Sequence, residues 1–131
     1  MANVLLILGG DSDQAARIGG YISEQGYAAC HLTAWDDLLG QVPAEGVLLI
    51  DLDTVATSGR SLDELKRRHP RLVVLTASDQ PFHPHLSQAL QRHVFAMLGK
   101  PIDPEELLFW LRSANRAGKS TPKADNDFAN S

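Results

Sequence analysis

Short apolar runs alternate with helical periodicities along most of this chain, and that alternation limits its fold more than any other feature. Five runs contain mostly aliphatic residues and lack the polar alternation of a strand with one face in water. Runs of this kind predict strands buried on both faces, as in a parallel sheet. They cover residues 4–8, 28–32, 47–52, 72–76 and 94–98. The second run, AACHL, is the least apolar, so we expect it at an edge of the sheet.

Helical patterns fill the intervals between these runs. Apolar residues spaced by three and four predict a first helix that stops at Gly26. Ser61, with Glu64 three positions later, has the spacing of a capping box and predicts the start of another helix. A short helix is expected after the second strand and a longer one over residues 84–92. Asp103 before a proline predicts the N-cap of the last helix.

A strand followed by a helix, repeated five times, predicts a parallel sheet with helices on both faces and right-handed crossovers. The 131 residues favour an α/β, flavodoxin-like doubly wound (βα)5 fold with strand order 2-1-3-4-5, because a closed barrel of such units needs about 250 residues. We expect a single domain over residues 1–117. Residues 118–131 are polar and aperiodic, so we expect a disordered tail or the stub of a linker there.

The charge balance argues against a nucleic-acid partner. Twelve Lys and Arg residues against sixteen Asp and Glu residues give a net charge of −4, whereas nucleic-acid binding needs a basic face. No apolar run reaches the roughly 18 residues that span a bilayer. The run at 4–8 is too short for a signal peptide and follows no basic region. We therefore expect a cytoplasmic protein with neither nucleic acid nor membrane as its partner.

Polar residues stand at the carboxyl ends of three predicted strands. Asp51 lies near the end of the third run, Thr76 ends the fourth, and Lys100 follows the fifth. The carboxyl ends of parallel strands share one edge of the sheet, where ligands bind in such folds. We therefore expect this carboxylate, hydroxyl and ammonium to converge. A purely structural ion pair between Asp51 and Lys100 is the alternative, because a buried carboxylate needs a partner.

The sequence around these residues resembles the receiver domain of bacterial two-component response regulators. VLLIDLDTVATSG at 47–59 is similar to the family's phosphoacceptor strand and loop, LVVLTAS at 72–78 to its strand ending in Thr-Ala, and GKPIDPEEL at 99–107 to its Lys-Pro turn. The resemblance covers about residues 3–117. It implies that Asp51 is the phosphoacceptor, that Thr76 is the switch hydroxyl and that Lys100 binds the phosphate.

The resemblance also implies a role in two-component phosphorelay signal transduction, as a phosphoprotein. We expect no enzyme activity beyond the chain's own phosphorylation and dephosphorylation. The expected partners are a sensor histidine kinase or another signalling protein, and a second copy of the chain bound through the last helix region. There, Leu108 and Phe109 lie off the predicted buried stripe. They either widen the core face of the helix or form a partner patch.

The chain departs from the family at the metal site. Gly9 and Gly10 stand where the family has a pair of acids that hold Mg²⁺, an ion that is bound through one or two carboxylates. Asp11, one position later, and Asp53, two residues after Asp51, are the candidates to replace them. Alternatively, Asp11 caps the first helix and Asp53 is a solvated loop acid. We expect Mg²⁺ binding to be weak, with no other cofactor.

A second departure concerns the surface that would report phosphorylation. Met97 occupies the position where the family has an aromatic switch residue, and strand alternation predicts that Phe95 shares its face. The segment 78–85 is rich in proline and histidine and about two residues longer than is usual in the family. Its histidines, His83 and His85, are expected to be loop residues rather than metal ligands, because no third ligand is near them in sequence.

These observations favour an atypical stand-alone receiver that acts through protein–protein binding, with impaired phosphorylation at Asp51. One alternative is a functional Mg²⁺-dependent phosphoacceptor that uses Asp11 or Asp53 for the metal. Another is a small α/β enzyme or nucleotide-binding protein that uses the same strand ends.

Overall fold

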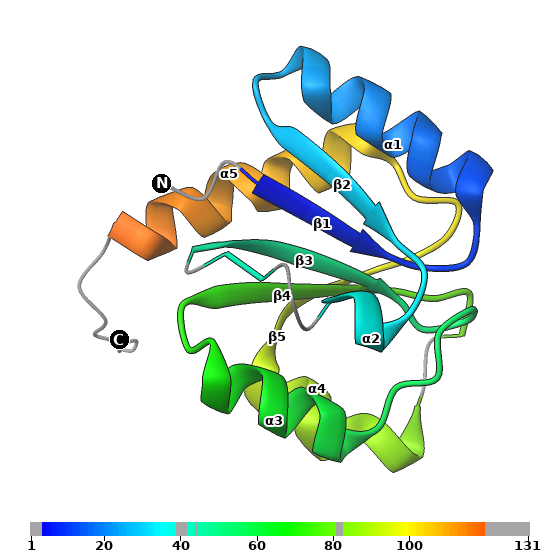
Figure 1. The fold of residues 1–131 in the computed structure, drawn as a ribbon, viewed down its shortest axis with the longest axis vertical. Helices are drawn as coiled ribbons and strands as arrows, with labels where there is room; N and C mark the ends of the chain where they lie inside the picture. Colours follow the sequence, from blue (N-terminus) through cyan, green and yellow to red (C-terminus); the bar gives the residue numbers. More distant parts are fainter. Residues whose placement is uncertain (1–3, 39–41, 44, 81–82, 120–131) are drawn as a thin grey trace.

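A computed structural model describes residues 4–38, 42–43, 45–80 and 83–119. In these residues, one parallel sheet contains five strands in the order β2-β1-β3-β4-β5 (Figure 1). The strands are β1 (Val4–Leu8), β2 (Ala28–Leu32), β3 (Gly46–Asp51), β4 (Leu72–Ala77) and β5 (Val94–Leu98). The predicted flavodoxin-like architecture and strand order are confirmed, and β2 lies at an edge as expected.

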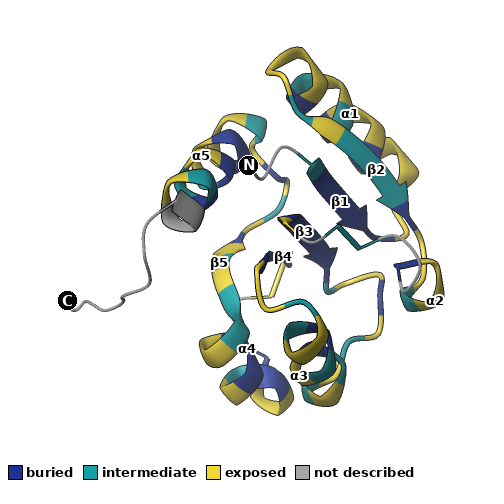
Figure 2. Cartoon of the chain, turned by 60° about the vertical axis from the view of Figure 1, so that its left-hand side comes forward, coloured by how far each residue is buried: buried dark blue, intermediate teal, exposed yellow. Residues whose placement is uncertain are grey.

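Helices cover both faces of the sheet. They are α1 (Ser12–Glu24), α2 (Trp35–Leu38), α3 (Gly59–Arg68), α4 (Ser87–His93) and α5 (Pro104–Lys119), with a 3₁₀ turn η1 (Pro84–Leu86) before α4. One core lies between the sheet and α1 with α5, and the other between the sheet and α3 with α4. Figure 2 shows the buried central strands β1 and β3, the less buried edge strands β2 and β5, and helices whose outer faces are exposed. In the part of the chain that the structure describes, no helix is long and apolar enough to cross a membrane.

The central strand explains why the apolar runs are continuous. Every residue of β3 is buried. Val47 and Leu49 pack into the core under α1 and α5, whereas Leu48 and Ile50 pack into the core under α3 and α4. Full burial of one such side chain contributes roughly 1.5–3 kcal/mol relative to leaving it in water. Both faces therefore select aliphatic residues, and the strand ends at Asp51 on the rim of the sheet.

The ends of two helices test the predicted caps. Gly26, just beyond α1, has a φ of +95°, a conformation that glycine adopts without strain. The capping box predicted at Ser61 is wrong. Ser58 is the N-cap of α3, and its hydroxyl oxygen accepts the backbone N–H of Ser61 at 3.0 Å. Ser61 thus lies inside the first turn.

An irregularity in β5 overturns one expectation about its side chains. Val94 pairs with Val74, but Ala96 pairs with Leu75, so β5 has one extra residue between them. This bulge interrupts strand alternation. The ring of Phe95 lies against Trp110 of α5, with centroids 5.9 Å apart. Ala96 and Leu98 pack into the core under α1 and α5, so Met97 between them points to the other face of β5. The prediction that Phe95 and Met97 share a face is therefore wrong.

The last helix extends past the predicted domain boundary at 117, since α5 continues to Lys119. The predicted tail beyond it, residues 120–131, lies outside the described residues. On this helix Leu108 is buried in the core and Phe109 is exposed. Leu108 thus widens the core face of α5, and Phe109 points away from it.

Candidate functional site

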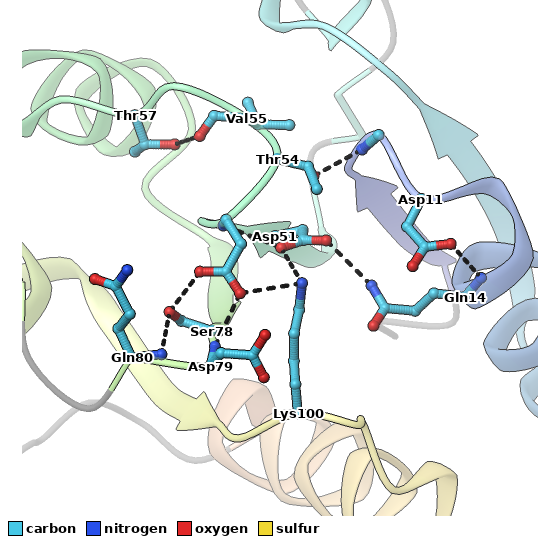
Figure 3. A network of polar contacts seen from close by, with 12 residues as sticks. Asp11, Gln14, Asp51, Thr54, Val55, Thr57, Ser78, Asp79, Gln80 and Lys100 are labelled. Atoms are coloured by element: carbon cyan, nitrogen blue, oxygen red, sulfur yellow. Dashed lines mark hydrogen bonds and ion pairs between the residues drawn. The ribbon is translucent and has the colours of Figure 1, made fainter.

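A buried ion pair joins two of the predicted site residues at the carboxyl edge of the sheet (Figure 3). Asp51, the last residue of β3, is 2% exposed. Lys100 comes from the loop after β5, and its Nζ lies 2.6 Å from Asp51 Oδ1 and 3.2 Å from Asp53 Oδ2. The Lys100 ammonium therefore contacts two carboxylates, and its charge offsets part of the free-energy cost of burying Asp51.

Two further donors complete the surroundings of Asp51. The backbone N–H of Asp53 donates to Asp51 Oδ1 at 3.1 Å, and Gln14 Nε2 donates to Oδ2 at 3.2 Å (Figure 3). Gln14 lies in the first turn of α1, and the sequence analysis did not identify it. Its position in that turn, at the same sheet edge as Asp51, is the signal that could have found it. Both oxygens of Asp51 thus accept hydrogen bonds.

Asp53 links the loop after β3 to the loop after β4. Its Oδ1 accepts the Ser78 hydroxyl at 2.8 Å, and its Oδ2 accepts the Asp79 backbone N–H at 2.9 Å. Burial raises the pKa of Asp53, but these two donors and Lys100 outweigh it and hold that pKa below its usual value. Burial likewise lowers the pKa of Lys100, but its bonds to Asp51 and Asp53 raise it above the usual value overall. Both shifts favour the charged forms, the carboxylate of Asp53 and the ammonium of Lys100.

Thr76 lies on the strand next to that of Asp51 but makes no hydrogen bond to it. Thr76 pairs with Ile50, while Asp51 pairs with Ala77, so alternation directs the Thr76 side chain towards α3 and α4. Its side chain is fully buried, and Oγ1 has no hydrogen-bond partner among the described residues. A buried hydroxyl without a partner costs about 1–3 kcal/mol. Thr76 therefore holds a donor that a rearrangement of this sheet edge could satisfy.

The two glycines after β1 let two loops approach each other closely. A Cβ at Gly9 would lie 2.9 Å from Asp51 Cβ, and one at Gly10 would lie 3.3 Å from Thr54 Cβ. The Gly10 backbone N–H donates to Thr54 Oγ1 at 2.8 Å. Asp11 is the N-cap of α1, where its Oδ1 accepts the Gln14 backbone N–H at 3.0 Å.

These contacts leave few side-chain oxygens that could act as ligands for Mg²⁺. Among residues 4–38, 42–43, 45–80 and 83–119, no group of three His, Cys, Asp or Glu side chains could hold a metal ion. Asp11 caps a helix, Asp53 is bonded to Ser78 and Asp79, and Asp51 Oδ1 is paired with Lys100. Mg²⁺ requires an octahedral shell with carboxylate ligands. The residues present therefore do not fit a dedicated Mg²⁺ site.

Because β5 is an edge strand, apolar side chains on both of its faces are exposed, together with one on α5. Phe95 is 42% exposed, Met97 46% and Phe109 54%, and we call these three residues the β5–α5 patch. Trp110 joins the two phenylalanines, because its ring makes edge-to-face contacts with both. Met97 also pairs with Thr76 across β4 and β5. The patch thus adjoins the residue whose hydroxyl has no partner.

Comparison with known proteins gives a result at the level of structure. No protein-family model matches the sequence, and no curated protein is significantly similar to it. The beryllofluoride-activated NtrC4 receiver domain dimer superposes with a TM-score of 0.79 at 15% identity, over 89% of this chain and 99% of that one. The signal receiver domain of an HD domain-containing protein from Pseudomonas fluorescens Pf-5 gives 0.77 at 17%, over 92% and 100%. This chain has the receiver-domain fold.

A longer protein is also similar to this chain. NtrX from Brucella abortus, in complex with ADP, matches with a TM-score of 0.71 at 22% identity, over 91% of this chain. This chain spans only 27% of the length of that protein. In this receiver fold, direct contacts join the predicted Asp51, Asp53 and Lys100. Thr76 Oγ1 has no partner among the described residues, and Asp11 caps α1 instead.

Proposed function

We propose that this chain is an atypical receiver that works in two-component signalling through protein–protein binding, and that Asp51 accepts a phosphoryl group only slowly. The observation that carries the proposal is the buried contact of 2.6 Å between Lys100 Nζ and Asp51 Oδ1 at the carboxyl edge of a receiver fold. An ammonium in this place suits a phosphorylated carboxylate as well as a free one, because it offsets negative charge in either state.

The chemistry explains why the reaction is slow. An oxygen of Asp51 attacks the phosphorus atom of a donor, the bond to the donor's leaving group breaks, and negative charge accumulates on the phosphoryl oxygens. Such a transition state is stabilised mainly by positioned cations and hydrogen-bond donors. Lys100 supplies one charge, whereas Gly9 and Gly10 supply no carboxylate for Mg²⁺. We therefore propose weak Mg²⁺ binding and a rate limited by poor charge neutralisation.

In this proposal, Thr76 responds to the phosphorylation of Asp51. Once a phosphoryl oxygen is on Asp51, the Thr76 hydroxyl gains an acceptor that it lacks among the described residues. Movement of Thr76 towards that acceptor shifts the population between two packings of β4 and its neighbours. Met97, its partner in β5, transmits the change to the β5–α5 patch.

The proposed partners follow from the patch and the site. A sensor histidine kinase or another signalling protein supplies the phosphoryl group, and the β5–α5 patch binds either a second copy or a target protein. Catalysis is limited to the chain's own phosphorylation and dephosphorylation. These events take place in the cytoplasm.

The proposal is tested by intact-mass spectrometry after incubation with acetyl phosphate and Mg²⁺. We expect slow, partial addition of one phosphoryl group, which is lost in Asp51→Asn. Fast and nearly complete addition would show that phosphorylation is not impaired. A complete lack of addition, together with no change in the amide NMR spectrum on adding beryllofluoride, would exclude Asp51 as an acceptor. Asp36→Asn, an exposed acid in α2, is the matched control and should react like the wild type.

A further inference from the structure

The long loop between β4 and α4 brings a histidine onto the network of Asp51. His83 is 9% exposed, and its Nε2 lies 3.0 Å from Ser78 Oγ. Ser78 Oγ lies 2.8 Å from Asp53 Oδ1, and Lys100 Nζ lies 3.2 Å from Asp53 Oδ2 and 2.6 Å from Asp51 Oδ1. An unbroken chain of polar contacts therefore runs from His83 to the carboxylate of Asp51.

The hydrogen-bond roles in this chain can be assigned by counting hydrogens. The Ser78 hydroxyl has a single hydrogen, which goes to Asp53 because an ionised carboxylate is only an acceptor. Ser78 Oγ also accepts the Gln80 backbone N–H at 3.0 Å. His83 Nε2 must therefore carry a hydrogen and donate to Ser78 Oγ. In the neutral imidazole, the lone pair is then left on Nδ1.

A cavity lies beside His83. The cavity has a volume of about 560 Å³, and His83 lies in its wall. The titratable and charged groups that share this wall are Asp53 from the loop after β3, and Asp79 and His85 from the segment between β4 and α4. Lys100 is connected to these residues through its contact with Asp53. Histidine is the side chain whose charge most readily changes near neutral pH.

We propose that His83 is a titratable positioning residue that acts on Asp51 through Ser78, Asp53 and Lys100. Protonation of the His83 ring adds a positive charge to a network that contains two carboxylates and one ammonium. The imidazolium is the stronger donor to Ser78, and it draws the Ser78 hydroxyl and Asp53 together. Lys100 is then held less by Asp53 and more by Asp51. The effect of His83 on phosphorylation rests on the proposed function, whereas the coupling between His83 and Asp51 does not.

The coupling is tested by NMR titration of the unphosphorylated protein between mildly acidic and mildly alkaline pH. The reporters are the ring signals of His83 and the backbone amide of Asp53, which donates to Asp51 Oδ1. We expect both to titrate with the same midpoint. In His83→Gln the shift of the Asp53 amide with that midpoint should be lost. His85→Gln, which alters the same cavity wall, should retain it. An Asp53 amide that titrates unchanged in His83→Gln would overturn the proposal.

A second variant covers the case in which His83→Gln does not fold. Ser78→Ala keeps the histidine but removes the hydroxyl between it and Asp53. The His83 ring should still titrate, while the Asp53 amide no longer follows it; an amide that still follows it would exclude the route through Ser78. The rate of modification by acetyl phosphate, compared at the two ends of the pH range, then reports the effect on Asp51. If no phosphoryl group is added at any pH, the proposed function fails, and the NMR result still decides the coupling.

Discussion

Lys100 is the residue on which this site depends, because it alone neutralises two carboxylates in the described network. Asp51 and Asp53 share it as their cation, and Asp51 has almost no contact with water. Taking one partner away from a buried ion pair leaves an uncompensated charge, which costs far more than the pair contributes as a whole. The stability of this part of the protein therefore depends on one side chain.

Lys100→Met should lower the free energy of unfolding by about 3 kcal/mol, as the loss of one partner in a buried pair does. Urea unfolding measures the change. Arg71→Met is the matched control, because Arg71 pairs with Glu45 at 3.0 Å on the surface and exposed pairs contribute about 1 kcal/mol or less. Asp51→Asn combined with Lys100→Met should recover much of the loss. Equal costs for Lys100→Met and Arg71→Met would show that Asp51 is solvated.

Gly9 is constrained by its contact with Asp51 rather than by its backbone angles. A Cβ there would lie 2.9 Å from Asp51 Cβ, so Gly9→Ala should destabilise the protein by about 1–3 kcal/mol, as overpacking does. Gly20 in α1 has open space around it, and Gly20→Ala should stabilise by about 1 kcal/mol, since alanine favours helices. Thermal unfolding of both variants measures the contrast. A neutral Gly9→Ala would mean that this loop moves freely away from β3.

At the scale of single elements, the strands were predictable and the details of their ends were not. Burial on both faces leaves continuous apolar runs, which is why β1, β2 and β5 coincide with the predicted ranges. The bulge in β5 depends on how this strand packs against α5, so no local pattern revealed it. The contacts of Gln14 and Ser78 depend on the rotation of a helix and the path of a loop. Asp51 and Lys100 were predictable, because strand ends meet at one edge.

The start of α3 shows how two similar signals compete. Ser58 precedes Gly59 and Arg60, whereas Ser61 precedes Leu62 and a run of better helix formers. The path of the chain decides which serine lies outside the first turn. Because Ser58 caps the helix, Ser58→Ala should cost about 1 kcal/mol. Ser61→Ala should cost less, because Ser61 donates its backbone N–H, which the substitution keeps. Urea unfolding of the two variants compares them, and a larger loss for Ser61→Ala would assign the cap to Ser61 instead.

At the scale of the whole molecule, the site and the β5–α5 patch form one system. Asp51 and Lys100 lie at the rim of the sheet, Thr76 lies one strand away, and Met97 beside it belongs to the patch. The charged rim and the exposed apolar side chains are therefore linked through the neighbouring strands β3, β4 and β5. Apolar and aromatic side chains that are exposed together are typical of protein interfaces.

The patch leads to a prediction about self-association. Aromatic side chains near the centre of an interface contribute most of its binding energy, and Phe109 is the most exposed member of the patch. Wild-type protein should therefore form dimers at high concentration, and Phe109→Glu should abolish them, because a charge buried in an apolar interface is not compensated. Analytical ultracentrifugation over a range of concentrations measures the equilibrium. Arg60→Glu, an exposed change in α3, should leave it unaltered.

Folding should survive the substitution, since Phe109 loses only an edge-to-face contact with Trp110 at 5.0 Å, worth about 0.5–1.5 kcal/mol. A far-ultraviolet circular dichroism spectrum like that of the wild type would verify this. Phe109→Glu dimers of undiminished affinity would place the self-association surface elsewhere. A wild-type protein that stays monomeric at every concentration would assign the patch to a different protein, and because Met97 pairs with Thr76, binding of that protein should still respond to the state of Asp51.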